Sequence, residues 1–282
     1  MVALSGPVVE RYDRFSLYNS PYPAHDAGCA VDLYPGGQSA PSPVAGEVLA
    51  TRTVRCPPKP YAAERDHLLL VDCGEVVARL LHVDPAVEEG DQVDVGDGLG
   101  TPVRSGFFGQ WVDNHVHLGF RAPDRNLRRA RGSLPLEVGV DVDGVAWDGA
   151  GTVIETGPTH VLLDAPDHDG RGFAAIASDE GVPLDGGLVH YAGGGALSPT
   201  TGELTLFGTP IGRADGRDVA WRDVAVSVER DDGRRVRATG LSLFASRVPF
   251  GAKVVFHDGH DFVVGDRLAV ILSATSDPVR LG

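Results

Sequence analysis

Two histidines separated by one residue, His115 and His117, are the residues of this sequence best suited to chemistry. They lie in an apolar run that predicts a β-strand, and the side chains at positions i and i+2 of a strand point to the same face. Two imidazoles would therefore stand side by side. This arrangement suits a metal ligand paired with a group that handles protons.

Residues upstream could complete such a site. His25 and Asp32 lie in one short segment, and His82 follows an apolar run. Two histidines and one carboxylate, with water in the fourth position, form a common ligand set for catalytic zinc. The first 117 residues thus contain five side chains suited to metal or proton chemistry.

The order of these residues and their flanking sequences resemble the lysostaphin-type zinc metallopeptidases, the group that includes LytM-like murein endopeptidases. The resemblance covers residues 20–122, less than half of the chain. It is carried by Gly-Cys-Ala-Val-Asp-Leu at 28–33, Pro-Val-Ala-Gly-Glu-Val at 43–48, the glycine-rich turn segment at 81–97 and the His-x-His strand at 114–120.

The resemblance implies a site and a reaction. His25, Asp32 and His117 would bind Zn²⁺ as the metal ligands. His82 and His115 would be catalytic, one taking a proton from water and the other stabilising the tetrahedral intermediate, and which does which stays open. The implied activity is that of a zinc metalloendopeptidase, which hydrolyses a peptide bond through a metal-activated water. The implied substrate is a peptide or a peptidoglycan-like chain.

The first motif departs from the lysostaphin pattern His-x-x-x-Asp, because six residues separate His25 from Asp32. This spacing, with Gly28 and Ala30 in between, is similar to the His-x-x-Gly-x-Ala-x-Asp motif of the related D-Ala-D-Ala metallopeptidases. Asp26 is an alternative carboxylate ligand. We expect Asp32 instead, because Asp26 directly follows His25 and Asp32 lies in a strand-like run.

The alternative to an enzyme is a catalytically inactive lysostaphin-type scaffold that acts as a partner-binding or regulatory module. The longer motif and the absence of a recognisable signal sequence favour the scaffold, whereas the presence of all five site residues favours the enzyme. A third hypothesis assigns ligand recognition to the second half of the chain. The aromatic residues of 136–282 are few and scattered, which gives that hypothesis no support.

The elements that position these residues are predicted to be almost entirely β. Short apolar runs punctuated by many of the 37 glycines and 20 prolines predict strands, and short helical turns are expected only near 62–65 and 125–131. We predict an all-β chain: a lysostaphin-type antiparallel domain at 1–122, a polar linker at 123–136 and an all-β domain of unknown role, a sandwich or a barrel, at 137–282. The predicted strands include residues 47–50, 67–71, 76–81, 116–120, 153–155, 160–163, 172–177, 204–207, 224–228, 241–245, 254–256 and 268–272.

Charge and composition restrict the partners and the environment. The net charge of −14, with only Lys59 and Lys253 as lysines, argues against a nucleic-acid partner. Strongly acidic surfaces suit a high-salt cytoplasm, so a halophilic archaeal source is one hypothesis and a high-GC bacterium is the other. No apolar stretch of about 18 residues predicts a membrane span. We expect a cytoplasmic protein, and the sequence leaves its oligomeric state open.

Overall fold

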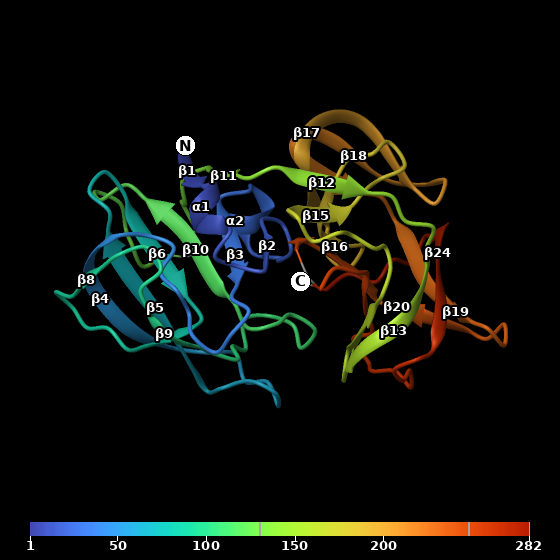
Figure 1. Ribbon diagram of the computed structural model, residues 1–282, viewed down its shortest axis with the longest axis horizontal. Coiled ribbons are helices and arrows are strands. Elements are labelled where there is room, and N and C mark those ends of the chain that lie inside the picture. The colour runs from blue at the N-terminus through green and yellow to red at the C-terminus, as the bar shows by residue number, and fades with distance from the viewer. Residues whose placement is uncertain (130, 248, 282) are drawn as a thin grey trace. The chain divides into compact units, whose positions relative to one another are not determined.

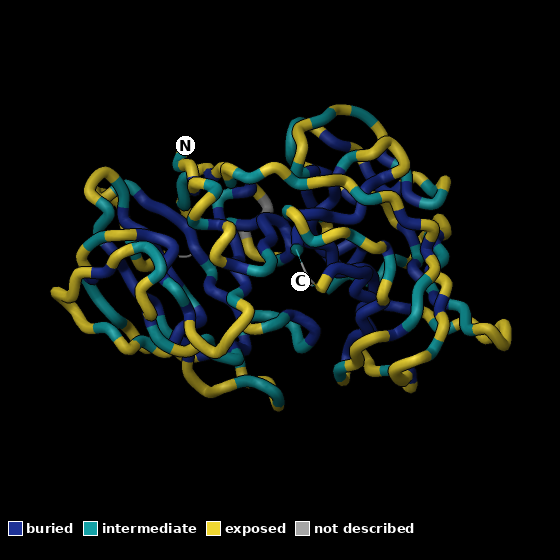
Figure 2. The backbone as a smooth tube through the Cα atoms, viewed as in Figure 1, coloured by how far each residue is buried: buried dark blue, intermediate teal, exposed yellow. Residues whose placement is uncertain are grey.

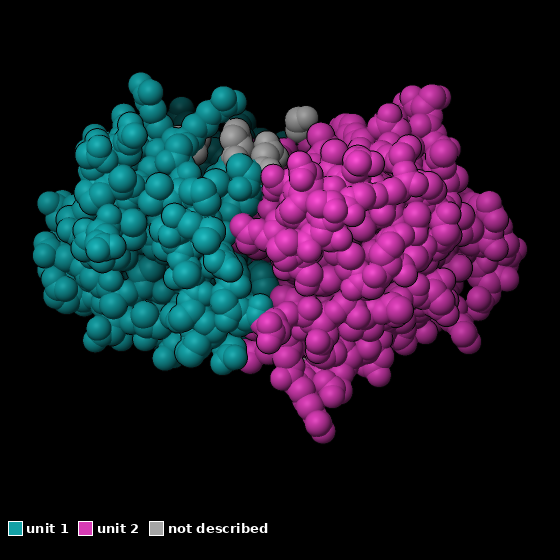
Figure 3. Space-filling view, turned by 90° about the horizontal axis from the view of Figure 1, so that it is seen from above, with its two compact units in different colours: residues 1–15, 23–140 teal, residues 16–22, 141–282 magenta. Residues whose placement is uncertain are grey.

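The computed structural model describes residues 1–129, 131–247 and 249–281, apart from the side chains of Pro23 and Asp26 (Figure 1). Within these ranges the helices are two single turns, α1 (Gly6–Val9) and α2 (Pro23–Asp26), and about half of the residues are in strands. The prediction of an all-β chain is confirmed. The chain divides into two compact units, residues 1–15 with 23–140 (unit 1) and residues 16–22 with 141–282 (unit 2), which Figure 3 shows in two colours.

Unit 1 contains an antiparallel sheet in the order β3-β10-β6-β5-β4-β8. Its strands are β3 (Ala30–Tyr34), β4 (Gly46–Arg55), β5 (Arg65–Asp72), β6 (Val77–Leu81), β8 (Gln92–Val93) and β10 (Val116–Arg121). The smaller strands are β1 (Val2–Ser5), β7 (Val83–Pro85), β9 (Gly100–Pro102) and β11 (Leu136–Gly139). The short strand β2 (Arg14–Ser16) begins in unit 1, and its last residue belongs to unit 2.

The register of this sheet assigns the core and the candidate site to opposite faces. Directly paired residues of adjacent strands point to one face, and successive residues alternate between faces. Val31, Leu118, Leu80 and Leu69 are paired across four strands, and all are fully buried. Figure 2 shows the distribution of buried residues along the whole backbone. The neighbouring row, which contains Asp32 and His117, therefore points to the other face.

The segment 123–136, where we expected a linker, lies within unit 1. The Arg121 guanidinium donates hydrogen bonds to the backbone oxygens of Asn126 (3.0 Å) and Arg129 (2.7 Å), and Arg79 donates to Leu127 O (2.6 Å). These backbone oxygens accept hydrogen bonds from arginine side chains, whereas in a helix they would accept from the backbone N–H groups that follow them. This explains why the helical turn expected near 125–131 is not found in the described part of the segment. No helix is found near 62–65 either.

Residues 16–22 belong to unit 2, although the sequence places them near the beginning of the chain. The buried carboxylate of Asp185 accepts hydrogen bonds from Ser16 Oγ (2.6 Å), from Leu17 N (2.6 Å) and from Tyr18 N (3.1 Å). The Asn19 side-chain amide donates to Ser242 Oγ at 2.7 Å. Nothing in the local sequence predicts these bonds, because the partners are more than 160 residues apart.

Unit 2 contains a largely antiparallel sheet system in the order β18-β17-β16-β21-β23-β14-β13-β24-β19-β20. In the described residues this order has two ends and does not close, so the expected barrel is not formed. Its strands are β13 (Ala150–Gly157), β14 (His160–Leu163), β16 (Leu184–Leu188), β17 (Gly193–Leu206), β18 (Thr209–Trp221), β19 (Val224–Arg230), β20 (Arg235–Ala238), β21 (Gly240–Leu243), β23 (Lys253–Val255) and β24 (Arg267–Ala274). Unit 2 also contains β12 (Val142–Val145), β15 (Phe173–Ile176) and β22 (Ala245–Ser246).

Every apolar run named above falls on a strand of the structure. The predicted runs leave out several strands, among them β16, β18 and β20. In β18, glycine, aspartate and arginine interrupt the apolar pattern. Among the described residues, no helix is long and apolar enough to cross a membrane.

Candidate metal centre

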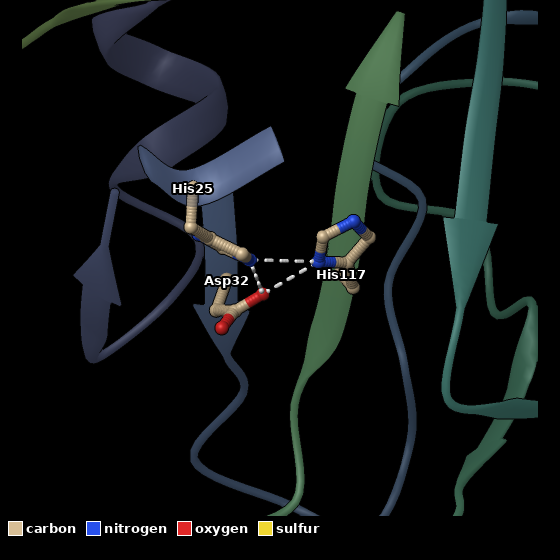
Figure 4. Close-up of side chains that lie close together, drawn as sticks. All are labelled: His25, Asp32 and His117. Carbon is tan, nitrogen blue, oxygen red and sulfur yellow. Dashed lines mark hydrogen bonds and ion pairs between the residues drawn. The ribbon is translucent and has the colours of Figure 1, made fainter. Parts of the chain in front are cut away.

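His25, Asp32 and His117 bring three potential ligand atoms together on the sheet of unit 1 (Figure 4). Asp32 Oδ1 lies 2.9 Å from His117 Nδ1 and 3.3 Å from His25 Nε2. The two ring nitrogens are 3.0 Å apart. All ligand atoms lie within 4.8 Å of one another, and this is the one such group found in the described residues.

The local fold explains how the long spacing between His25 and Asp32 still produces a cluster. Helix α2 carries His25, and the chain then turns at Gly28, which has a φ of +58° that favours glycine. Backbone hydrogen bonds from Gly28 N to His25 O (3.0 Å) and from Cys29 N to Ala24 O (2.7 Å) close this turn. The residues between His25 and Ala30 thus form one compact turn, and β3 begins directly after it.

The sheet register positions the other two members. In the antiparallel pair of β3 and β10, Asp32 is the direct partner of His117. Side chains of directly opposite residues point to the same face at short range. His25 and Asp32 are buried, and His117 is only partly exposed.

Burial and neighbouring charge set the protonation of this cluster. Burial by itself would raise the pKa of Asp32, but the neighbouring His115 and His25, together with the hydrogen bond to His117, lower it well below its usual range. Burial lowers the pKa of His117 to about 4. The cluster therefore combines an ionised carboxylate with a neutral imidazole at neutral pH, which is the protonation that metal binding requires.

His115 lies immediately before β10 and also approaches Asp32. Its Nε2 is 3.5 Å from Asp32 Oδ1, and its Nδ1 is 2.8 Å from the backbone oxygen of Asp113. A carbonyl oxygen only accepts, so Nδ1 carries the proton and Nε2 presents a lone pair. Burial lowers the pKa of His115 to about 4, which keeps this ring neutral.

His82 directly follows β6, and Asp66 of β5 holds it in place. Asp66 Oδ2 accepts from His82 Nδ1 (2.5 Å) and from Ser105 Oγ (2.6 Å). Asp66 Oδ1 accepts from the backbone N–H groups of His82 (3.0 Å) and His67 (2.6 Å). Burial would raise the pKa of Asp66, but these hydrogen bonds and the neighbouring His82 lower it, so the carboxylate is ionised. With the Nδ1 proton held by Asp66, Nε2 is the atom that carries the lone pair when the His82 ring is neutral.

The His82 ring is 4.9 Å from the His115 ring and 5.9 Å from the His117 ring, measured between centroids. Its backbone has a φ of +69°, a conformation that a residue with a Cβ adopts only at some cost. The bond from its N–H to Asp66 helps to hold this conformation, which turns the ring toward the other histidines.

Aromatic rings cover one side of the histidines. The Phe108 ring lies 4.7 Å from that of His115 and 5.2 Å from that of His82, and Tyr34 lies 5.1 Å from His115. Arg104 fixes the loop that carries Phe108, because it donates to the backbone oxygens of Gly109, Gln110 and Val112. This apolar wall shields the rings from water.

The structure thus brings all five predicted site residues into one part of unit 1: His25, Asp32, His82, His115 and His117. The Asp26 side chain, which we had considered as an alternative ligand, lies outside the described part of the structure. Sequence reasoning missed Asp66 and Ser105. Asp66 is fully buried and so needs hydrogen-bond donors, but the sequence shows neither its burial nor its partners.

Unit 1 is therefore a β-sheet domain that carries a buried His-Asp-His cluster with two further histidines beside it. Residues 3–138 match the N-terminal domain, and residues 143–273 the C-terminal domain, of a family described as a domain of unknown function (DUF8155). The two matched segments together span nearly the whole chain, which belongs to this family. Comparisons with curated proteins and with solved structures gave no match.

Proposed function

We propose that unit 1 is a zinc-dependent endopeptidase, which cleaves a peptide bond by means of a metal-activated water. One observation carries the proposal: the ligand atoms of His25, Asp32 and His117 lie within 4.8 Å of one another, and two more imidazoles adjoin them. The same residues carry the resemblance to lysostaphin-type metallopeptidases.

The donor set fits zinc. Catalytic zinc sites commonly use three protein ligands drawn from histidine and carboxylate, with a fourth position left for water or substrate. Here one ionised carboxylate and two imidazoles would bind the zinc ion. The bound ion would lower the pKa of its water toward about 7 and would polarise the carbonyl of a substrate. Because the three ligand atoms already lie close together, the side chains would need little rearrangement to bind the ion.

Within this proposal, His82 is the proton acceptor. Its Nδ1 proton is held by the Asp66 carboxylate at 2.5 Å, so its Nε2 is the free basic atom. A carboxylate in this position fixes the tautomer and stabilises the imidazolium that forms when Nε2 takes up a proton. His115 Nε2 supplies a second acceptor beside Asp32 and would orient the attacking water.

Metal analysis and a hydrolysis assay test the proposal together. Protein purified without added metal should contain one zinc per chain and should cleave members of a mixed library of murein and ordinary peptides. A chelator should abolish cleavage, and added zinc should restore it. Protein that takes up no zinc and cleaves none of these peptides would instead support the inactive scaffold.

A further inference from the structure

Two buried arginines lie on neighbouring strands of unit 1, away from the metal cluster. Arg79 of β6 and Arg121 of β10 are only 6% and 2% exposed. The two strands are paired, with Arg79 opposite Gly119, and Arg121 is two residues further along β10. All three residues therefore point to the same face of the sheet.

Among the described residues, these two positive charges have no negative partner. In the described part of the chain, no carboxylate lies within ion-pair distance of either guanidinium, and both groups donate their hydrogen bonds to neutral backbone oxygens. Burial, together with the charge of Arg121, lowers the pKa of Arg79 to about 10. Both groups stay charged at neutral pH, and buried charges are normally paired.

Hydrogen-bond donors are left over at the same place. Arg121 Nε is buried and, among the described residues, has no hydrogen-bond partner; the same holds for Ser133 Oγ. A Cβ built on Gly119 would lie 3.2 Å from Ser133 Oγ, and one on Gly132 would lie 3.4 Å from Arg121 Nη1. The Ser133 hydroxyl thus lies beside Gly119, and the Arg121 guanidinium lies beside Gly132, two positions that have no side chain.

We propose that Arg79, Arg121 and Ser133 form a binding site for a small inorganic anion, which neutralises the arginine pair and fastens residues 126–129 and 131–133 to the sheet. The anion would accept from Arg121 Nε and Ser133 Oγ, the donors that the protein itself leaves unused. Chloride and phosphate share this chemistry. The site does not depend on the metal cluster or on any catalytic activity.

Thermal unfolding of the full chain tests the site. The total ionic strength is held constant with potassium gluconate, whose anion is much larger than chloride or phosphate. Replacing part of it with potassium chloride, or in a second series with potassium phosphate, should raise the unfolding temperature by a few degrees in a saturable manner. The series that shows the rise identifies the anion.

Variants separate a site from a general salt effect. Ser133→Ala and Arg121→Gln should lose the rise, whereas Arg125→Gln, at an exposed arginine of the same segment, should keep it. Ser133→Ala keeps both arginines, so it remains informative if Arg121→Gln does not fold. An equal rise in all four proteins, or no rise in the parent with either anion, would overturn the proposal. Crystals soaked in bromide or arsenate should show anomalous density beside Arg121 Nε.

Discussion

Asp66 and His82 are joined twice: Asp66 Oδ2 lies 2.5 Å from His82 Nδ1, and Asp66 Oδ1 accepts from the His82 backbone N–H at 3.0 Å. The first bond sets the tautomer of the ring, and the second supports the left-handed backbone that turns the ring toward His115. One carboxylate therefore controls both the orientation and the protonation of a histidine that lies beside the proposed zinc ligands.

Asp66→Asn should keep the zinc and lose most of the hydrolysis. The amide cannot stabilise a protonated His82, so we expect kcat/KM to fall by roughly 10²- to 10⁴-fold. Steady-state kinetics with zinc-loaded protein measures the loss. Asp84→Asn is the matched control, because this exposed aspartate contacts His67 and not His82. Equal activity in parent and Asp66→Asn would remove His82 as the proton acceptor.

His117→Ala and His115→Ala should separate metal binding from turnover. His117 supplies one of the three proposed ligands, so its loss should weaken zinc binding by more than about 100-fold, beyond the effect of losing an outer-shell partner. His115→Ala should retain the zinc and lose turnover. Zinc titration with a competing chelator measures both affinities. The reverse result would mean that the roles of the two histidines are exchanged.

Asp32→Asn should also release zinc, because it removes the only carboxylate of the three-residue group. The Asp26→Asn variant should keep its zinc, since Asp32 is the direct cross-strand partner of His117. Zinc content after gel filtration distinguishes them. Retention by Asp32→Asn together with loss from Asp26→Asn would assign the carboxylate ligand to Asp26.

His190 of unit 2 should make the native state less stable in acid. Burial, reinforced by the charge of Arg280, lowers its pKa from 6.5 to about 3. Between these values the unfolded chain binds a proton that the native chain does not, so stability falls as the pH falls through this window. The slope from this group is up to about 1.4 kcal/mol per pH unit.

His190→Gln should flatten that slope, whatever its effect on stability at neutral pH. Urea unfolding at several pH values from 4 to about 7 measures the slope. His257→Gln, at an exposed histidine, serves as the control and should leave the slope unchanged. Identical slopes in the parent and in His190→Gln would contradict the assignment.

Screening of the net charge of −14 should stabilise the protein as salt rises. The Debye length shrinks from about 30 Å at 0.01 M to about 3 Å at 1 M, which removes the repulsion between surface carboxylates. Potassium gluconate tests this without chloride. A variant with the exposed residues Asp141, Asp231 and Asp258 changed to Asn should need less salt for the same unfolding temperature. An unchanged salt dependence would exclude charge screening as the cause.

The sequence by itself determined the fold class and the identity of the five candidate site residues. Strands can be recognised from short segments of the sequence, because burial of one or both faces of a strand requires short apolar runs such as 68–71 and 116–120. The residue types of the site are also readable, since histidine and aspartate stand out within or beside such apolar runs and aspartate is rarely buried without a partner. The direct pairing of Asp32 with His117 is not readable, because it depends on the register between two strands that are 85 residues apart.

Only the tertiary structure decided which other residues act on the site and where the chain changes units. Asp66 reaches His82 and Ser105 through the folding of three separate segments, so no spacing along the chain reveals it. The same is true of Asp185, which holds residues 16–18 in unit 2, and of the arginines that bind segment 126–129 to the sheet. A buried charge is satisfied by whatever the fold brings near it. The partner is therefore a property of three-dimensional packing, whereas the apolar pattern that drives the packing is a property of the sequence.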